Sequence, residues 1–393
     1  MSSLELTKEE QEALDGKKGD AIASAYRILL AIGNATGADR LVPVEWAHVS
    51  GVNYNTIGDA GVEFLENFSE GAKVAIRTTV NPMGFDRDNP GDLPQQFIEK
   101  QTSIASSYRR MGVTPSFTCT PYEVFDIPRR GSAVSFAESN AAVFANSILG
   151  LATNKESALS ALASAVTGKA PLSDLRIGKF RQPQVAIELE PGLEPRTELD
   201  YGILGYFTGK AVNESCAAIH GISEDLPTPA AKAISAGIGT SGSCGMFTAK
   251  DDKKVKVKDR IAFGKREAAS VMDELNTAED GDIVAFGSPQ LGMAELSSLA
   301  SAVKGRKFTK RCIIFCSRAI HAQASKAGLV DRIEGAGGEF MRDCCMCLTP
   351  LITKEKFDAV ITNSVKGAYY MNNSNKVKVA LKDMKTIVDT CAR

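Results

Sequence analysis

GDIVAFGSPQLGMAELSSLASAV, residues 281–303, starts as a short apolar run, passes through Gly, Ser and Pro, and continues with a helical pattern. An apolar run that leads into a helix in this way is typical of a β-strand that feeds a crossover helix. The pattern recurs at RCIIFCSRAIHAQASKAGL (311–329), SAVSFAESNAAVFANSILG (132–150), KVAIRTTVNPMG (73–84) and FDAVITNSVKGAYYM (357–371). The sequence therefore predicts an α/β protein, with parallel sheets that carry helices on both faces.

The length of the chain indicates more than one folding unit. A chain of 393 residues exceeds what a single hydrophobic core usually serves. ELEPGLEPRTELDYG (188–202) is rich in Pro and Glu and is the candidate linker. We expect an N-terminal α/β unit with a helical start over residues 1–195, a C-terminal α/β unit over 196–393, and an active-site cleft between them. The first helix is expected to begin with a capping box formed by Thr7 and Glu10.

Charge and hydropathy exclude several classes of function. A net charge of −1 offers no basic surface for a phosphate backbone, so no nucleic-acid partner is expected. No apolar run approaches the roughly 18 residues that span a bilayer, and the polar N-terminus lacks the apolar region of a secretory signal. We therefore expect a cytoplasmic protein without a membrane partner. Nine irregularly spaced cysteines in that reducing compartment do not indicate a disulfide framework.

Candidate chemistry collects where the predicted strands end, because ligands of open parallel sheets bind beyond the carboxyl ends of the strands. The side chains found there are Asn81, Cys119, Glu138, Ser139, Cys316, Ser317, Arg318, Asn363, Ser364 and Lys366. Ser139 begins a predicted helix, where free backbone N–H groups favour an anion. The cations available near predicted loops for holding a carboxylate or a phosphate are Arg318, Lys366, Arg129 and Arg130. Surface solvation is the alternative for each of these cations.

Cysteine stands at two of these strand ends, and GEFMRDCCMCLTP (338–350) brings three more close together. Three thiolates from separate segments suit an iron–sulfur cluster with one open iron, which can act as a Lewis acid on a substrate hydroxyl. For any single cysteine, the alternative is a small buried hydrophobe. Cys312 and Cys316 would be about 13 Å apart in a strand, so only Cys316 is a candidate and Cys312 is predicted to be core. A structural zinc site is not indicated, because the cysteines lack a second pair at zinc-finger spacing.

One glycine-rich segment imitates a cofactor motif. GIGTSG (237–242) matches the dinucleotide-binding pattern G-x-G-x-x-G. It follows a helical run, AAKAISA (230–236), and therefore lacks the strand–turn–helix context that this pattern requires. We predict a glycine-rich turn that packs backbone against backbone, in which Cys244 is structural.

Six segments together resemble the aconitase X family. They are AHVSGVNYNTIGDAG (47–61), NPMGFDRD (81–88), FTCTPY (117–122), FAESNAAVFANSILG (136–150), CSR (316–318) and DCCMC (343–347). The similarity keeps the same order along nearly the whole chain, and the length resembles the large subunit of the two-chain archaeal form. This resemblance implies an aconitase-like fold that lacks the swivelling domain. It also implies, as a partner, a small subunit that carries this domain.

The resemblance also implies a reaction. The activity that it implies is dehydration of (R)-5-phosphomevalonate to trans-anhydromevalonate 5-phosphate, a step of the modified mevalonate pathway toward isoprenoids in archaea, with a [4Fe-4S] cluster. Dehydration of cis-3-hydroxy-L-proline is the alternative within the family. A non-catalytic iron-binding regulatory protein is the alternative from another class. Aconitase-like enzymes take their base from a serine of the swivelling domain, so we expect the small subunit to supply the base.

The family pattern, matched position by position, implies particular site residues. The implied cluster ligands are Cys119, Cys316 and Cys345, and Cys344 and Cys347 are left open as replacements for Cys345. The implied substrate contacts are Gly51, Val52, Asn53, Asn81, Pro82, Glu138, Ser139, Lys366 and Gly367. Asn53 stands where the family commonly has Ser. Arg318 is the candidate catalytic residue of this chain.

Overall fold

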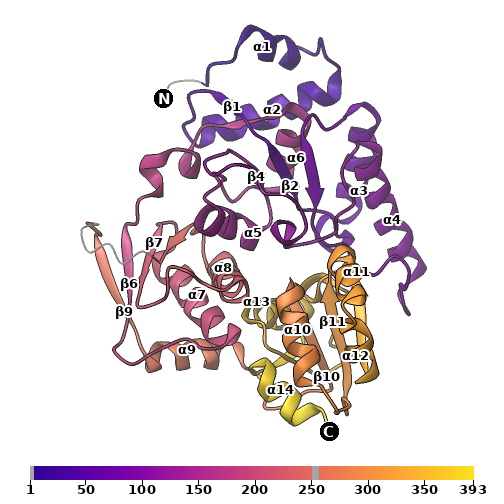
Figure 1. The fold of residues 1–393 in the computed structure, drawn as a ribbon. Coiled ribbons are helices and arrows are strands. Elements are labelled where there is room, and N and C mark those ends of the chain that lie inside the picture. Colours follow the sequence, from indigo (N-terminus) through magenta and orange to yellow (C-terminus); the bar gives the residue numbers. More distant parts are fainter. Residues whose placement is uncertain (1–3, 250–255) are drawn as a thin grey trace.

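Parallel sheets organise the chain in the computed structural model, which describes residues 4–249 and 256–393 (Figure 1). The first sheet has the strand order β3 (Arg77–Val80), β2 (Trp46–Val49) and β4 (Ser135–Phe136). The helices of this unit are α1 (Lys8–Leu14), α2 (Asp20–Ala35), α3 (Tyr54–Gly71), α4 (Gln95–Arg110), α5 (Ser139–Phe144) and α6 (Ala158–Thr167). A separate antiparallel pair joins β1 (Leu41–Pro43) to β5 (Lys169–Pro171).

Helix α1 begins as the sequence predicts. The side chain of Thr7 accepts a hydrogen bond from the backbone N–H of Glu10, and the Glu10 carboxylate accepts one from the backbone N–H of Thr7. These two bonds satisfy donors that the start of a helix otherwise leaves unpaired. The predicted capping box is therefore confirmed.

A second sheet follows in the chain. Its strand order is β8 (Phe247–Thr248), β7 (Ala217–His220), β6 (Val185–Leu189) and β9 (Asp259–Phe263). Its helices are α7 (Glu198–Val212), α8 (Thr228–Ser241) and α9 (Lys265–Leu275). Residues 188–202, the candidate linker, end β6 and begin α7. Strand β6 precedes residue 195 and pairs with strands that follow it, so the sheet spans the expected boundary between two units, and the two-unit division stays a prediction.

The glycine-rich segment lies in and just after α8, so the predicted turn is wrong. Glycine here serves helix packing: a Cβ on Gly237 would lie 2.5 Å from the backbone oxygen of Gly202, and one on Gly205 would lie 2.3 Å from that of Ile234. Any side chain at these positions would separate α7 from α8. The predicted packing of backbone against backbone is confirmed, because close contact here outweighs the low helix propensity of glycine.

The third sheet has five parallel strands and is buried on both faces. Their order is β12 (Gly338–Arg342), β11 (Arg311–Cys316), β10 (Ile283–Leu291), β13 (Ala359–Thr362) and β14 (Lys378–Leu381). Alternate side chains enter one core with α10 (Met293–Ala302), α11 (Arg318–Lys326), α12 (Leu329–Gly335) and α14 (Met384–Cys391), or another core with α9 and α13 (Val365–Tyr370). The fully buried Cys312 confirms its predicted core position. Helices on both faces, with parallel strands between them, confirm the predicted α/β class.

Each of the three parallel sheets, together with its helices, is called a unit below, and a buried ion group connects the three units. The ammonium of Lys232 on α8 lies 2.9 Å from Glu123 Oε2 of the first unit and 2.5 Å from Glu295 Oε2 of the third. It also donates to the backbone oxygen of Gln290 at 3.0 Å. Lys232 is only 2% exposed, and burial acts to lower its pKa, but the two carboxylates outweigh burial and hold the pKa above its ordinary value. The three units therefore share one charged contact.

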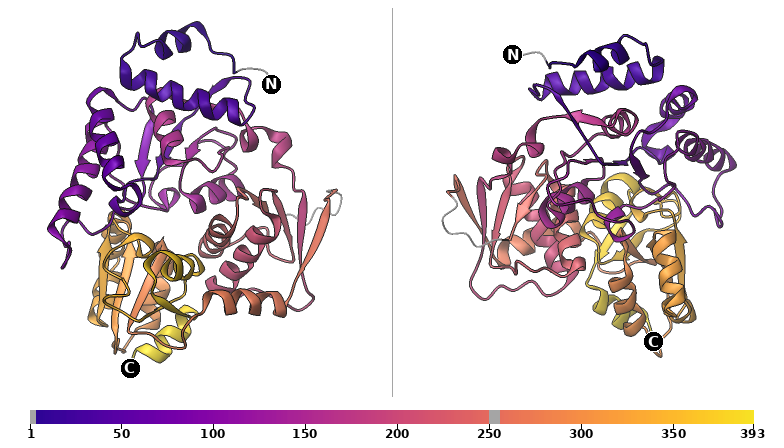
Figure 2. Two further views of the ribbon diagram at one scale, coloured as in Figure 1. Left: turned by 180° about the vertical axis from the view of Figure 1, so that it is seen from behind. Right: turned by 45° about the horizontal axis from the view of Figure 1, so that its top comes forward.

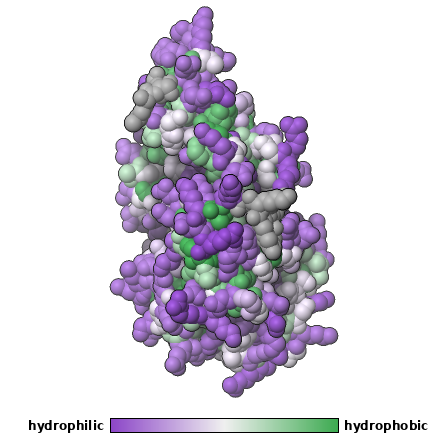
Figure 3. All heavy atoms as spheres, turned by 90° about the vertical axis from the view of Figure 1, so that its left-hand side faces the viewer, coloured by the Kyte–Doolittle hydropathy of each residue, from purple (hydrophilic) through white to green (hydrophobic). Residues whose placement is uncertain are grey.

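The arrangement of the units agrees in all ribbon views. In both views of Figure 2, the C-terminal strands and helices, orange to yellow, lie against the first unit and beside the second. Hydrophilic side chains cover most of the face in Figure 3, where hydrophobic ones gather only in small groups. Among the described helices, none combines the length and apolar character that a membrane span requires.

Candidate active site

A cavity of about 410 Å³ opens where strands of the first and third sheets end. Its walls follow β2, β3 and β4 on one side and β12 and β13 on the other, so both expected units contribute. The residues implied for the site that line it are Gly51, Val52, Asn53, Asn81, Pro82, Cys119, Glu138, Ser139, Cys345 and Lys366. Strand ends far apart in sequence thus meet at one place, as expected for open parallel sheets.

Backbone geometry shapes the wall after β2. Gly51 has a φ of +74°, and a Cβ there would lie 2.9 Å from the Cβ of Ala158. Glycine fits because it takes positive φ without strain and leaves room for the neighbouring helix. Asn53 then begins α3 as its N-cap, and its side-chain oxygen accepts the N–H of Asn55 at 2.9 Å. The chain can therefore turn sharply from strand to helix beside the cavity.

Three thiols meet at the cavity, those of Cys119, Cys345 and Cys347. Hydrogen bonds from Cys119 and Cys347 hold the pKa of Cys345 well below its ordinary value. Burial raises the pKa of Cys119 and of Cys347. The backbone N–H of Gln290 donates to Cys119 Sγ at 3.2 Å, and Ser288 Oγ lies 2.7 Å from Cys347 Sγ.

Cys316 does not belong to this group, so the predicted third thiol is corrected. Side chains alternate along a strand, and Cys316 shares its face with Cys312, in the core beneath α10, α11 and α12. Cys347 lines the cavity in its place. The available signal was only the closeness of Cys347 to Cys345 in sequence; Cys347 lies in a short 3-10 helix, Met346–Leu348, to which strand alternation does not apply.

The donor set suits an iron–sulfur cluster. Among the described residues, no group of three or more His, Cys, Asp or Glu side chains is arranged to hold a metal ion. Thiols from separate segments are nevertheless the ligands that such clusters use, and soft thiolates select iron–sulfur centres. Cys119, Cys345 and Cys347 also border an open cavity rather than a closed core. By donor chemistry and access, these three residues could hold the cluster.

A buried ion pair forms another wall of the cavity. Lys366 pairs with Glu138, and its ammonium donates to Asn140 Oδ1 at 2.7 Å. The amide of Asn140 donates in turn to the backbone oxygen of Cys119 at 2.9 Å. Burial acts to lower the pKa of Lys366, but Glu138 outweighs burial and the pKa lies above its ordinary value. Lys366 therefore brings a positive charge to the cavity.

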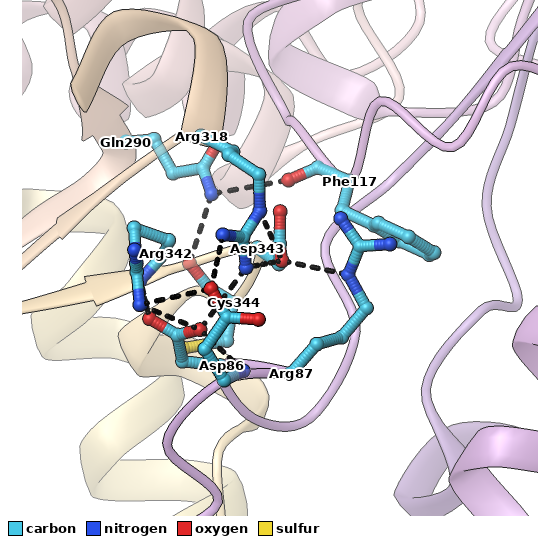
Figure 4. Close-up of polar contacts among 9 residues, drawn as sticks. Asp86, Arg87, Phe117, Gln290, Arg318, Arg342, Asp343 and Cys344 are labelled. Atoms are coloured by element: carbon cyan, nitrogen blue, oxygen red, sulfur yellow. Dashed lines mark hydrogen bonds and ion pairs between the residues drawn. The ribbon is translucent and has the colours of Figure 1, made fainter. Parts of the chain in front are cut away.

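Arg318 lies outside the cavity, so its predicted catalytic role lacks structural support. Its guanidinium bonds Asp343 Oδ2 at 2.7 Å (Figure 4). It also bonds Asp88 Oδ2 at 2.6 Å. Arg129 and Arg130 do not line the cavity either. The implied contact Gly367 is also absent from the lining; its backbone N–H donates to Ser364 Oγ at 2.7 Å.

Arg318 is part of a charged cluster that fixes the segment before the cysteines. Asp86 and Asp343 are fully buried, and Arg342 and Arg87 pair with them at 2.7 Å and 2.9 Å, respectively (Figure 4). Asp343 has a φ of +64°, a backbone angle that residues other than glycine rarely adopt. Its backbone oxygen accepts the N–H of Met83 at 2.8 Å. The cluster therefore joins the loop after β3 to the cysteine segment.

Gln290 is a site residue that the sequence did not reveal. It is fully buried, and its Nε2 donates to the backbone oxygens of Phe117 and Cys344 at 3.2 Å and 2.9 Å (Figure 4). Its Oε1 accepts the backbone N–H of Cys119 at 3.3 Å. One amide thus holds two cysteine segments in register. A single glutamine near the end of a strand carries no distinct sequence signal.

Models of the aconitase X family match this chain in three parts. The first-domain model matches residues 3–178, the second-domain model 183–273 and the third-domain model 281–393. The second match spans the boundary expected at residue 195. The phosphomevalonate dehydratase large subunit of Methanocaldococcus jannaschii is 35% identical, over 98% of this chain and 99% of the relative.

Two further comparisons extend this result. A cis-3-hydroxy-L-proline dehydratase of Pseudomonas aeruginosa is 34% identical over 92% of this chain, which spans only 65% of that relative. The crystal structure of Thermococcus kodakaraensis aconitase X in its holo-form superposes with a TM-score of 0.91, at 32% identity, over 99% of this chain and 100% of that chain.

The fold and the cavity define an aconitase-like α/β protein, as the sequence predicted. Within that class, the matches cover nearly the whole length. This chain belongs to the aconitase X family.

Proposed function

We propose that the chain is the large subunit of a phosphomevalonate dehydratase, which removes water from (R)-5-phosphomevalonate to give trans-anhydromevalonate 5-phosphate. The supporting observation is the end-to-end match with relatives of that name. Five of them match over 92–99% of their own length, whereas the hydroxyproline dehydratases extend well beyond this chain. By this proposal the chain is a hydro-lyase subunit of the archaeal modified mevalonate pathway.

Cys119, Cys345 and Cys347 would hold a [4Fe-4S] cluster at the cavity. When bound, such a cluster supplies a Lewis acid that favours loss of the substrate hydroxyl. The position of the three thiols at one cavity supports this assignment, and hydrogen bonds from Cys119 and Cys347 lower the pKa of Cys345, which favours its thiolate form. Gln290 keeps the Cys119 and Cys344 backbones in place on either side of the site.

The protein side chains provide a place for an anionic substrate. Lys366 carries a positive charge at the cavity, and a cation placed beside a carboxylate stabilises the charge that develops when the neighbouring proton is removed. Glu138 already accepts hydrogen bonds from Lys366 and Asn81, which keeps it occupied as an acceptor. We therefore propose that the base comes from a small subunit that carries the swivelling domain.

Reconstitution tests this proposal directly. The purified chain, loaded with iron and sulfide under anaerobic conditions, is mixed with the candidate small subunit and assayed with (R)-5-phosphomevalonate. We expect dehydration only in the mixture, and none with either subunit alone. Cis-3-hydroxy-L-proline serves as the comparison substrate, because two relatives of nearly equal identity are named as its dehydratases.

Three results would contradict the proposal. Turnover by the chain alone would show that the base lies within it. Faster turnover of hydroxyproline than of phosphomevalonate by the mixture would move the chain to the other activity. A preparation that binds iron but converts neither substrate with its partner would favour the regulatory alternative.

A further inference from the structure

A line of buried polar side chains leads from the core of the first sheet to the cavity. Trp46 Nε1 lies 2.9 Å from Thr79 Oγ1, which lies 2.8 Å from His48 Nδ1. His48 Nε2 lies 2.9 Å from Asn81 Oδ1, and Asn81 Nδ2 lies 2.5 Å from Glu138 Oε2. None of the five residues is more than 9% exposed. Of the five, only Asn81 and Glu138 line the cavity.

The parallel register of the sheet builds this line. His48 and Thr79 are paired across β2 and β3, and Trp46 lies two residues before His48 on the same strand face. The ring of Phe136 packs edge-on against both, with ring centroids 4.9 Å from Trp46 and 5.7 Å from His48. The apolar surroundings leave each polar atom dependent on its neighbours in the line.

Both ends of the line fix the direction of its hydrogen bonds. The Nε1–H of Trp46 can only donate, so Thr79 Oγ1 accepts it. The hydroxyl proton of Thr79 then goes to His48 Nδ1, because its other neighbour, the backbone oxygen of Ala47, is 3.5 Å away. At the far end, the Glu138 carboxylate pairs with Lys366 and accepts from the Asn81 amide nitrogen. The Asn81 oxygen must therefore face His48.

The directions of these hydrogen bonds are compatible with only one arrangement of the protons. With Nδ1 of His48 as an acceptor and the oxygen of Asn81 opposite Nε2, the imidazole carries its proton on Nε2. Burial lowers the pKa of His48 to about 4, although the Glu138 carboxylate raises it, so the ring stays neutral near pH 7. A neutral ring with one defined tautomer can orient a neighbour without taking part in proton transfer.

We propose that His48 is a positioning residue, whose Nε2–H holds the Asn81 side chain with its oxygen turned into the core and its amide N–H groups turned toward Glu138 and the cavity. A ligand group beside Asn81 then meets an N–H donor, which suits an acceptor such as a carboxylate or phosphate oxygen. This inference rests on the proposed function only for the identity of that ligand. The tautomer and the amide orientation follow from the chain itself.

The first test reads the tautomer without any activity. The full chain is labelled with ¹⁵N-histidine, and long-range ¹H–¹⁵N correlations are recorded at pH 7. His220→Gln and His321→Gln variants assign the signals of the three histidines. We expect a neutral His48 protonated on Nε2. A neutral ring protonated on Nδ1, or a charged imidazolium, would overturn the proposal.

The Thr79→Val variant tests the origin of the tautomer. It keeps the shape of the side chain and removes the hydroxyl that donates to Nδ1. We expect the Nδ1 resonance of His48 to shift, because this nitrogen loses its hydrogen-bond donor, while Nε2 keeps its proton on the Asn81 oxygen. The matched control is Thr102→Val, whose exposed hydroxyl bonds only its own helix, and which should leave the His48 signals unchanged. An unchanged Nδ1 resonance in Thr79→Val would contradict the direction assigned to the line.

The functional test uses the assembled enzyme. His48→Met removes the donor to Asn81, and His48→Gln retains one. We expect His48→Met to raise KM at least about tenfold, the effect of losing one hydrogen bond to a charged group, with a smaller change in kcat. His48→Gln should recover part of the loss. Wild-type KM in a folded His48→Met variant would overturn the role in positioning.

Failure of the proposed function can be distinguished from failure of the positioning role of His48. If the wild-type assembly turns over neither substrate, the proposed function fails while the tautomer result still stands. If His48→Met does not fold, the Thr79→Val spectrum decides the proposal without it.

Discussion

At the scale of single residues, the side chain of Gln290 binds three backbone groups near the cavity thiols. We predict that Gln290→Leu lowers the free energy of unfolding by roughly 2–5 kcal/mol, because two carbonyl oxygens and one N–H lose their partner in a buried setting. Urea unfolding of the purified chain measures this effect. Gln95→Leu is the control, because its amide bonds only exposed Glu99 at 3.0 Å. Equal losses in the two variants would contradict the prediction.

The lowered pKa of the buried His48 should make the stability of the fold depend on pH. Its pKa is about 4 in the folded chain, against an ordinary value of 6.5 when the chain is unfolded, so the unfolded chain binds this proton first as the pH falls. The free energy of unfolding should therefore decline between about pH 6.5 and 4, by roughly 3 kcal/mol from this residue, and level off below. His48→Gln should lose that part of the decline. Parallel curves for both proteins across this interval would show that the ring titrates normally.

The face of the strand on which a side chain lies explains why Cys316 was assigned wrongly as a cluster ligand. The sequence places Cys316 at a strand end, which is correct, but the face of a side chain depends on register against neighbours that a single segment does not contain. Both faces of the third sheet are apolar, so no polar alternation marks the side that meets the cavity. Cys347 was recognisable only as a neighbour two residues from Cys345.

At the scale of elements, local signals were reliable where one helix contains all the partners. The capping box of α1 is an example, because Thr7 and Glu10 lie three residues apart and need no tertiary context. The glycine-rich segment shows the opposite case. Gly237 is placed by its contact with α7, more than thirty residues away in sequence, and local propensity predicted a turn.

Removing the α1 cap should have a local effect. Thr7→Ala deletes the side-chain acceptor of the Glu10 N–H, and we expect a loss of about 1 kcal/mol that is confined to α1. Faster hydrogen exchange over Lys8–Leu14, with protection of β2 and β3 unchanged, would show this. Thr7→Ser retains the acceptor and should exchange like the wild type. Faster exchange throughout the first sheet would refute a local role.

At the scale of the whole molecule, Lys232 joins all three units. Lys232→Met leaves the carboxylates of Glu123 and Glu295 buried without their cation, so we expect a loss of roughly 3–5 kcal/mol in the free energy of unfolding. Lys210→Met is the matched control, because that ion pair with Glu274 is half exposed and should contribute at most about 1 kcal/mol. Denaturant titration compares the two variants. A loss below that of the control would contradict the shared-charge role.

Sequence patterns predicted the α/β class and most of the cavity lining, because parallel strands bring their carboxyl ends together whatever the spacing between segments. Ten of the implied residues meet there. The patterns did not predict what the cations do. Arg318 stands at a strand end like the others, yet two buried carboxylates from distant segments bind it, and charge pairing of that kind is visible only in three dimensions.

The shared ammonium of Lys232 also limits how this polypeptide can be divided. A truncated product that ends before residue 281 keeps Lys232 and Glu123 but loses Glu295, and one that starts there keeps Glu295 alone. Each piece would also expose apolar side chains of the core that runs through all three sheets. Expression trials that seek a minimal soluble fragment should therefore give aggregated protein at this junction.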